Sequence, residues 1–70
     1  MKINLYPILK KISQAELARL LVKDGIYKSF ESARNAIQNH LHQRVKSVDL
    51  ALLEYLEKEY KMKRKDLLID

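Results

Sequence analysis

Residues 13–25 read SQAELARLLVKDG, and this stretch decides the fold class. It opens with the spacing of a capping box, in which a serine hydroxyl accepts the backbone N–H of a glutamate three residues later while the carboxylate reaches back. Leucine and alanine side chains then form an apolar stripe at helical spacing. The stretch ends on Gly25, the only glycine of the chain, which suits a left-handed C-terminal cap. We therefore expect a helix over residues 14–23, followed by a turn.

Apolar residues also recur at helical spacing on both sides of this stretch. Pro7 fits in the first turn of a helix, where its missing N–H leaves no gap in the hydrogen-bond ladder. Ser29 and Ser47 are each placed to cap the start of a helix. The pattern predicts four more helices, at residues 4–12, 30–42, 48–60 and 62–69.

The composition supports an all-helical fold. Seventy residues suffice for one domain, residues 1–70, whose core is small. The absence of cysteine excludes disulfides and thiolate zinc sites. One glycine and one proline are too few for the many tight turns of a sandwich or barrel. We expect an all-α domain, a compact bundle of about five short helices.

Membrane insertion is not expected. The longest apolar run, residues 50–53, is far shorter than the roughly 20 residues that span a bilayer. Residues 1–12 contain scattered lysines and lack the small-residue cleavage site of a signal peptide. We expect a soluble, cytoplasmic protein with no membrane partner.

The charge is unevenly distributed along the chain, whose formal net charge is +5. Basic and acidic side chains number five and two in residues 1–25, four and one in residues 26–48, and five and six in residues 49–70. The excess cations therefore lie in the first two thirds. Phosphate would be attracted there and repelled by the acidic helix expected at 48–60.

The helix expected at residues 30–42 has an exposed face of short polar side chains. Asn and Ser are poorer helix formers than Lys and Glu, which are usual on a solvent-exposed face. The residues of this face therefore make the helix less stable. Asn and Gln can bond two atoms of an adenine edge in the major groove, which admits an α-helix. The flanking cations Lys28, Arg44 and Lys46 would hold phosphates. An ordinary polar surface explains the same composition equally well.

The sequence resembles the Cro- and phage-repressor-like (XRE) helix-turn-helix family. Residues 13–18 match its S-Q-x-E-L-A pattern, residues 50–56 are similar to its leucine-rich fourth helix, and residues 62–67 to its closing V-S-x-x-x-L turn. The resemblance covers residues 8–68 and implies a lambda-repressor-like fold. The chain departs from the family pattern in a long turn at residues 22–28 and in lacking Asn-Gly after the third helix.

The resemblance also implies the residues of a DNA site. In that family the Gln at the start of the second helix touches a phosphate, and the first exposed turns of the third helix read bases. The implied phosphate contact is Gln14, and the implied base-reading residues are Lys28, Ser29, Ser32, Arg34 and Asn35. Gln38 and Asn39 are further candidates on the same face, and Arg44 and Lys46 are candidates for phosphate contacts.

No catalytic or metal site is expected. His40 and His42 are two residues apart and so point to different sides of a helix, with no cysteine or convergent carboxylate pair beside them. We expect His40 to be a partly buried packing residue and His42 to be a surface or backbone-contacting residue. There is no glycine-rich phosphate loop, so neither a cofactor nor an enzymatic activity is expected.

The leading hypothesis is a sequence-specific double-stranded DNA-binding module, a small transcriptional regulator with the helix at 30–42 in the major groove. A homodimer would add the specificity that one small interface lacks. Apolar residues of the last two helices could form its interface: Leu50, Tyr55, Leu68 and Ile69. The alternative is a protein-interaction domain on the same scaffold, such as an adaptor, an antitoxin-like partner or an inhibitor.

RNA binding is a third hypothesis. Single-stranded RNA is recognised by stacking bases on exposed aromatic rings. Phe30, Tyr55 and Tyr60 are expected to pack, which leaves Tyr6 and Tyr27 as free aromatic residues. The sequence therefore favours double-stranded DNA over RNA as the partner.

Overall fold

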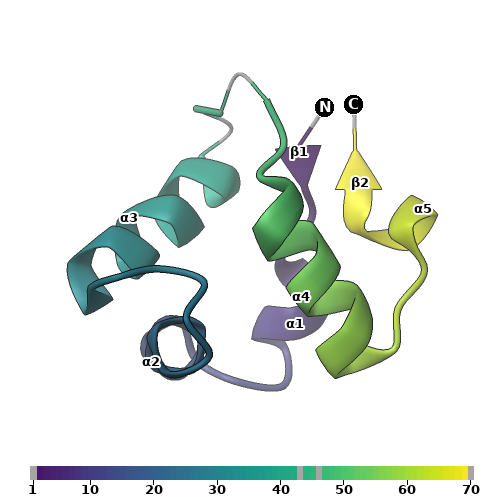
Figure 1. Cartoon of the computed structure of the whole chain (residues 1–70). Coiled ribbons are helices and arrows are strands. Elements are labelled where there is room, and N and C mark those ends of the chain that lie inside the picture. The colour runs from purple at the N-terminus through teal and green to yellow at the C-terminus, as the bar shows by residue number, and fades with distance from the viewer. Residues whose placement is uncertain (1, 43, 46, 70) are drawn as a thin grey trace.

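The computed structural model of the chain describes residues 2–42, 44–45 and 47–69. Within them the chain forms five helices and two short antiparallel strands (Figure 1). In chain order the elements are β1 (Lys2–Ile3), α1 (Tyr6–Leu9), α2 (Gln14–Lys23), α3 (Phe30–Leu41), α4 (Leu50–Tyr60), α5 (Arg64–Leu67) and β2 (Leu68–Ile69). The expected all-α bundle of five short helices is confirmed.

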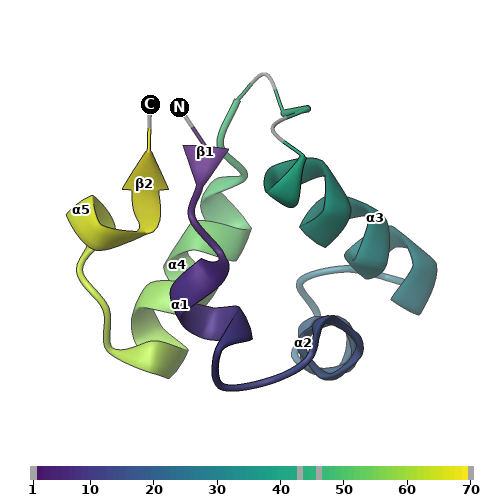
Figure 2. The same ribbon diagram turned by 180° about the vertical axis from the view of Figure 1, so that it is seen from behind.

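A single apolar core joins all five helices. Both views place α4 between α3 on one side and α5 with β2 on the other (Figures 1 and 2). The core residues, each at most 1% exposed, are Ile3, Leu5, Ile8, Leu17, Ala18, Leu21, Ala33, Ile37, Leu52, Leu53, Leu56 and Leu67. Burying one large aliphatic side chain contributes about 1.5–3 kcal/mol, so this cluster holds the short helices together.

Local signals define α2 and the start of α3. The Ser13 hydroxyl accepts the backbone N–H of Glu16 at 3.1 Å and donates to the Glu16 carboxylate at 3.5 Å. The carboxylate thus meets the serine hydroxyl instead of reaching back to the backbone. Gly25 has a φ of +79° just after α2. Ser29 caps α3 by accepting the N–H of Ser32 at 3.1 Å. These boundaries are the predicted ones.

The start of α4 differs from the prediction. The helix begins at Leu50 instead of residue 48, and its N-cap is Asp49, not Ser47. One carboxylate oxygen of Asp49 accepts two backbone N–H groups of the first turn, at 3.1 and 3.4 Å. The other accepts the hydroxyl of Tyr27 at 2.6 Å. This bond from the α2–α3 turn fixes the carboxylate in place, and no local pattern in the sequence predicts it.

The helices are short. α1 covers only Tyr6–Leu9 instead of the expected residues 4–12. Its N-cap residue, Leu5, forms no side-chain hydrogen bond, although the Asn4 side chain accepts the backbone N–H of Tyr6 at 3.2 Å. Pro7 lies in its first turn, as expected. The longest helix, α3, has 12 residues. Within the part of the chain that the structure describes, none combines the length and the apolar character that a bilayer-crossing helix needs.

The two ends of the described chain pair with each other. The helix expected at 62–69 is confined to α5, and the residues after it form β2. β2 runs antiparallel to β1, with Ile3 opposite Leu68. Next to this pair the backbone N–H of Asn4 donates to the carbonyl of Leu67 at 2.6 Å. Local periodicity cannot show a pairing between segments so far apart in sequence.

Candidate nucleic-acid interface

α2 and α3 are contacting helices joined by the turn of residues 24–29. In Figure 1, α2 is seen end-on while α3 runs across the view, so the two cross steeply. The turn is longer than the three or four residues usual in a helix-turn-helix. The N–H of Ile26 donates to the carbonyl of Leu21 at 2.8 Å, and the Tyr27 hydroxyl donates to Asp49 at 2.6 Å. The additional residues of the turn are therefore held against the rest of the protein by these hydrogen bonds.

The open face of α3 carries four of the ten predicted contact residues: Ser32, Arg34, Asn35 and Asn39. Ala33, Ile37 and His40 are buried, which leaves the opposite side of the helix to solvent. The exposed residues of the helix and its C-cap, apart from Phe30, are Glu31, Ser32, Arg34, Asn35, Asn39 and His42. Within the described residues the amide side chains of Asn35 and Asn39 form no hydrogen bond. Their donors and acceptors are available to a partner.

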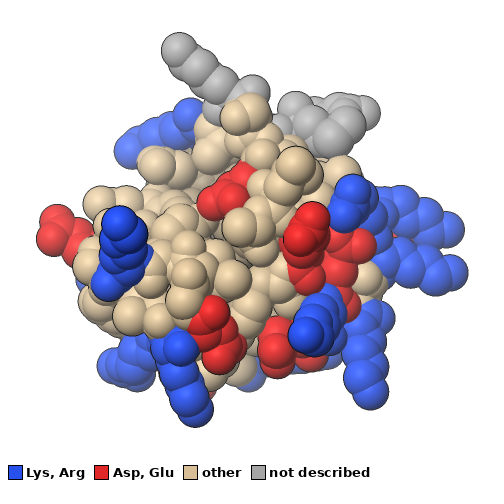
Figure 3. All heavy atoms as spheres, viewed as in Figure 1, with Lys and Arg blue, Asp and Glu red and all other residues tan. Residues whose placement is uncertain are grey.

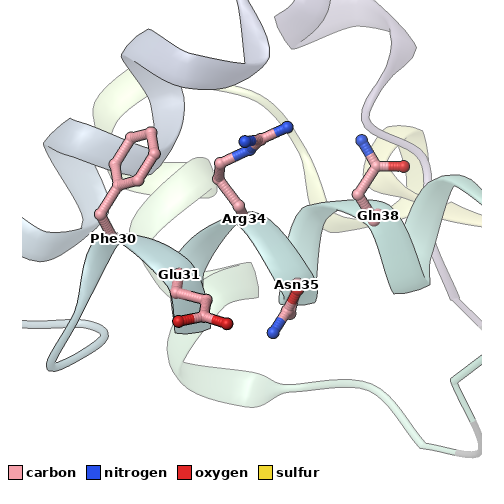
Figure 4. Close-up of a pocket in the computed structure, with 5 residues that line it drawn as sticks. All are labelled: Phe30, Glu31, Arg34, Asn35 and Gln38. Carbon is pink, nitrogen blue, oxygen red and sulfur yellow. The ribbon is translucent and has the colours of Figure 1, made fainter.

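Side chains leave α3 in two rows (Figure 4). Phe30, Arg34 and Gln38 point to one side, and Glu31 and Asn35 point to the other. Together they line a shallow depression of about 410 Å³. All five come from one helix, so no second element closes the depression. It is an open surface that suits a large partner better than a small molecule, which usually binds in an enclosed cleft.

Two predicted contact residues, Gln14 and Gln38, are brought together. The Nε2 of Gln38 donates to the Oε1 of Gln14, and the Oε1 of Gln38 lies 3.0 Å from the Nε2 of His42. Both atoms of the Gln38 amide are therefore engaged within the protein. Gln14 keeps its own amide nitrogen as a donor at the N-terminus of α2. Gln38 is thus placed to orient Gln14.

The two predicted serines differ in whether the hydroxyl hydrogen is free to bond a partner. The Ser29 hydroxyl accepts the N–H of Ser32 and donates to the Ser32 hydroxyl at 2.9 Å, so its role is to cap α3. Ser32 is exposed and still has its own hydroxyl hydrogen. Of the pair, Ser32 is the one available to a partner.

Cations surround this face. Lys28 precedes α3, Arg34 lies on it and Arg44 follows it, and all three are exposed. Arg19 of α2 is also exposed; the sequence reasoning missed it, although the spacing of the buried residues of α2 places it on the outside. Lys46, another predicted contact, lies outside the described residues. Figure 3 shows cations over the α2–α3 side and over α5, with acidic groups over α4 between them and others among the cations of the α2–α3 side.

Phe30 departs from the prediction. Instead of packing in the core it is 39% exposed, and the guanidinium carbons of Arg19 and Arg34 each lie 5.9 Å from its ring centroid. Tyr27, expected to be free, packs against the core and bonds Asp49. The reason is position: Phe30 is the first residue of α3 and extends beyond the core, whereas the turn folds Tyr27 inward.

Two titratable groups, one in α3 and one in the turn before it, have shifted pKa values. His40 is buried more fully than expected, and its Nδ1 accepts the backbone N–H of Ile3 at 3.5 Å. Burial lowers the pKa of His40, and the negative charge of Asp49 partly opposes this. Burial also raises the pKa of Tyr27, and its hydrogen bond to Asp49 raises it further. Among the described residues no group of three or more His, Cys, Asp or Glu side chains could hold a metal ion.

Comparison with known proteins gave no match: no family model, no curated protein and no solved structure is significantly similar to the chain.

Proposed function

We propose that this chain is a sequence-specific double-stranded DNA-binding module, a small transcriptional regulator whose α3 enters the major groove. The observation that carries the proposal is the pair of exposed amide side chains, Asn35 and Asn39, which form no hydrogen bond within the described residues. An asparagine amide can bond N6 and N7 of adenine together in that groove. A helix face that served only solubility would more often carry Lys and Glu.

The groups around this face suit the phosphate backbone. Lys28 and Arg44 lie beyond the two ends of α3, and Arg19 lies on the neighbouring helix. The free amide nitrogen of Gln14 lies at the N-terminus of α2, where backbone N–H groups and the helix dipole favour an anion. Contacts of this kind hold the protein in register on the duplex, while base contacts carry the specificity.

The resemblance to the Cro- and phage-repressor-like family supports the same placement. It assigns a phosphate contact to Gln14 and base contacts to the start of α3. The long turn at 24–29 does not cover that part of the helix, since Arg34 and Asn35 remain exposed. The departure from the family pattern therefore leaves the proposed DNA-contacting face open.

Salt dependence tests the proposal. Binding of a fluorescent duplex, measured by anisotropy at increasing salt, should weaken steeply because phosphate contacts release counterions. Lys28→Ala should reduce the slope of log K against log salt by about one unit. Lys65→Ala also removes an exposed cation, here from α5, and should leave the slope unchanged.

Asn35→Ala separates base reading from phosphate contact. It should leave the salt slope unchanged and lower the preference for a selected duplex over random duplex by about tenfold. Duplex binding that ignores salt, or a full set of α3 variants that bind as the wild type does, would contradict the proposal. In that event the face of α3 belongs to the alternative, a protein-interaction domain.

A homodimer through α4 and the segment expected to be the last helix, which the structure divides into α5 and β2, is part of the proposal. Of the four residues expected at its interface, Leu50 is 59% exposed and Ile69 is 38% exposed. Tyr55 and Leu68 instead pack partly against the core of their own chain, and the Tyr55 hydroxyl donates to Asp24 at 2.7 Å. The proposed interface therefore centres on Leu50 and Ile69.

A further inference from the structure

Phe30 is the only apolar residue on the exposed side of α3. Its side chain is 39% exposed and projects in the same row as Arg34 and Gln38 (Figure 4). Single apolar side chains are common on protein surfaces. This one, however, lies at the N-terminal end of the helix that carries the exposed amides and lines the same depression as Asn35. Its position is therefore part of the candidate interface.

Two cations hold the ring in place. The guanidinium carbons of Arg19 and Arg34 both lie 5.9 Å from the ring centroid, one coming from α2 and the other from α3. At this distance a cation is attracted by the electrons of the ring face. The aromatic ring is thus restrained between two helices, in a setting that is positively charged and open to solvent.

We propose that Phe30 determines specificity by an apolar contact with the C5-methyl group of a thymine in the major groove. The inference rests on the proposed function and names the base that this part of α3 reads. The thymine methyl is the apolar group that the major groove presents, and a phenylalanine ring is one of its partners. Arg19 and Arg34 are positioning residues for the ring, and their guanidinium groups also attract the flanking phosphates.

The surroundings of the ring favour this contact over base stacking. A stacked base needs the space above a ring face, as in single-strand binding. Each guanidinium group occupies space over the ring, so stacking would have to displace a cation that the ring attracts. A methyl group needs only a small exposed part of the ring.

The test uses a duplex selected from a random-sequence library by repeated binding to the whole chain. Each thymine is then replaced in turn by deoxyuridine, which removes only the C5-methyl group. One of these replacements should weaken binding about three- to fivefold, the factor for one methyl group leaving an apolar contact. In Phe30→Ala the same replacement should have no effect, because the ring is absent.

Two further variants serve as controls. Phe30→Leu keeps an apolar side chain and should retain part of the discrimination. Tyr6→Ala removes a more exposed ring, 65% exposed on α1, and should retain all of it. Circular dichroism confirms that each variant is folded before its binding is compared.

The inference fails if no thymine replacement weakens binding of the wild type, or if Phe30→Ala responds to the replacement as the wild type does. Both results leave salt-dependent duplex binding intact. They are therefore distinct from failure of the proposed function, in which no duplex is bound in a salt-dependent manner. A preference for single strands that Phe30→Ala loses would show that the ring stacks on bases, and it would also overturn the inference.

Discussion

His40 is the one polar side chain buried in the described core, at 4% exposed. Its pKa is lowered by burial, so the unfolded chain takes up a proton at higher pH than the folded chain does. The contribution of the neutral ring to stability is complete above the usual pKa of 6.5 and is lost as the pH falls through the lower pKa of the folded state. Protonation would also remove the acceptor for the N–H of Ile3.

We therefore expect the free energy of unfolding, measured by urea titration, to fall as the pH is lowered from about 7.5 to about 5. His40→Gln should be less stable at neutral pH and should lose most of this pH dependence. His42→Gln removes an exposed imidazole and should keep the dependence. A wild type whose stability is constant across this range would contradict the assignment to His40.

Single residues also show how far the candidate site follows from sequence. Helical spacing alone predicted that Asn35 and Asn39 lie on the open side of α3, because the buried residues fix the rotation of the helix. Phe30 and Arg19 were not predicted, since their meeting depends on how α2 crosses α3. The engagement of Gln38 with Gln14 depends on the same crossing. Contacts within one helix were predictable, and contacts between helices were not.

Among the elements, α4 yields a prediction because its cap differs from the expected one. Asp49→Ala should destabilise the protein by about 2 kcal/mol, since it removes a helix cap worth about 1 kcal/mol and a hydrogen bond to Tyr27 worth about as much. Ser47→Ala should change the free energy of unfolding by less than about 0.5 kcal/mol, because Ser47 is exposed and caps nothing. Thermal or urea unfolding of the two variants side by side measures the difference.

Asp49→Asn refines this test. The amide oxygen can still cap α4, but the amide nitrogen cannot accept the Tyr27 hydroxyl, which Asp49 accepts with its second carboxylate oxygen. Its cost should therefore lie between those of the other two variants. Equal costs for Asp49→Ala and Ser47→Ala would mean that the cap contributes nothing measurable.

An element could be predicted from the sequence when the residues that define its ends lie within it or next to it. α2 and the start of α3 have serine caps and one glycine within the same stretch of chain, and both were predicted correctly. α1 and α5 have no side-chain cap at their start, so their lengths depend on packing and were overestimated. The pairing of β1 with β2 joins residues at opposite ends of the described chain, beyond the reach of any local pattern.

At the scale of the whole molecule, the exposed Leu50 bears on assembly. Sedimentation velocity from micromolar to millimolar concentration should show a mass that rises towards that of a dimer. Leu50→Ser should shift this transition to higher concentration, because an apolar contact worth about 1.5–3 kcal/mol per partner is removed. Ala51→Ser changes the neighbouring exposed residue and should have no effect. A wild type that stays monomeric throughout would contradict the proposed dimer.

The β1–β2 pair also has a kinetic consequence. It closes a loop that contains every helix, and the entropy lost in closing a loop grows with its length. α2 and α3 contact each other across residues 24–29, a far shorter loop than the one that the strands close, so the contacts between the two strands should form after those between α2 and α3. In hydrogen exchange the amide of Asn4, which bonds Leu67, should then exchange sooner than the amides inside α2. The terminal strands would be the last part of the fold to close and the first to open.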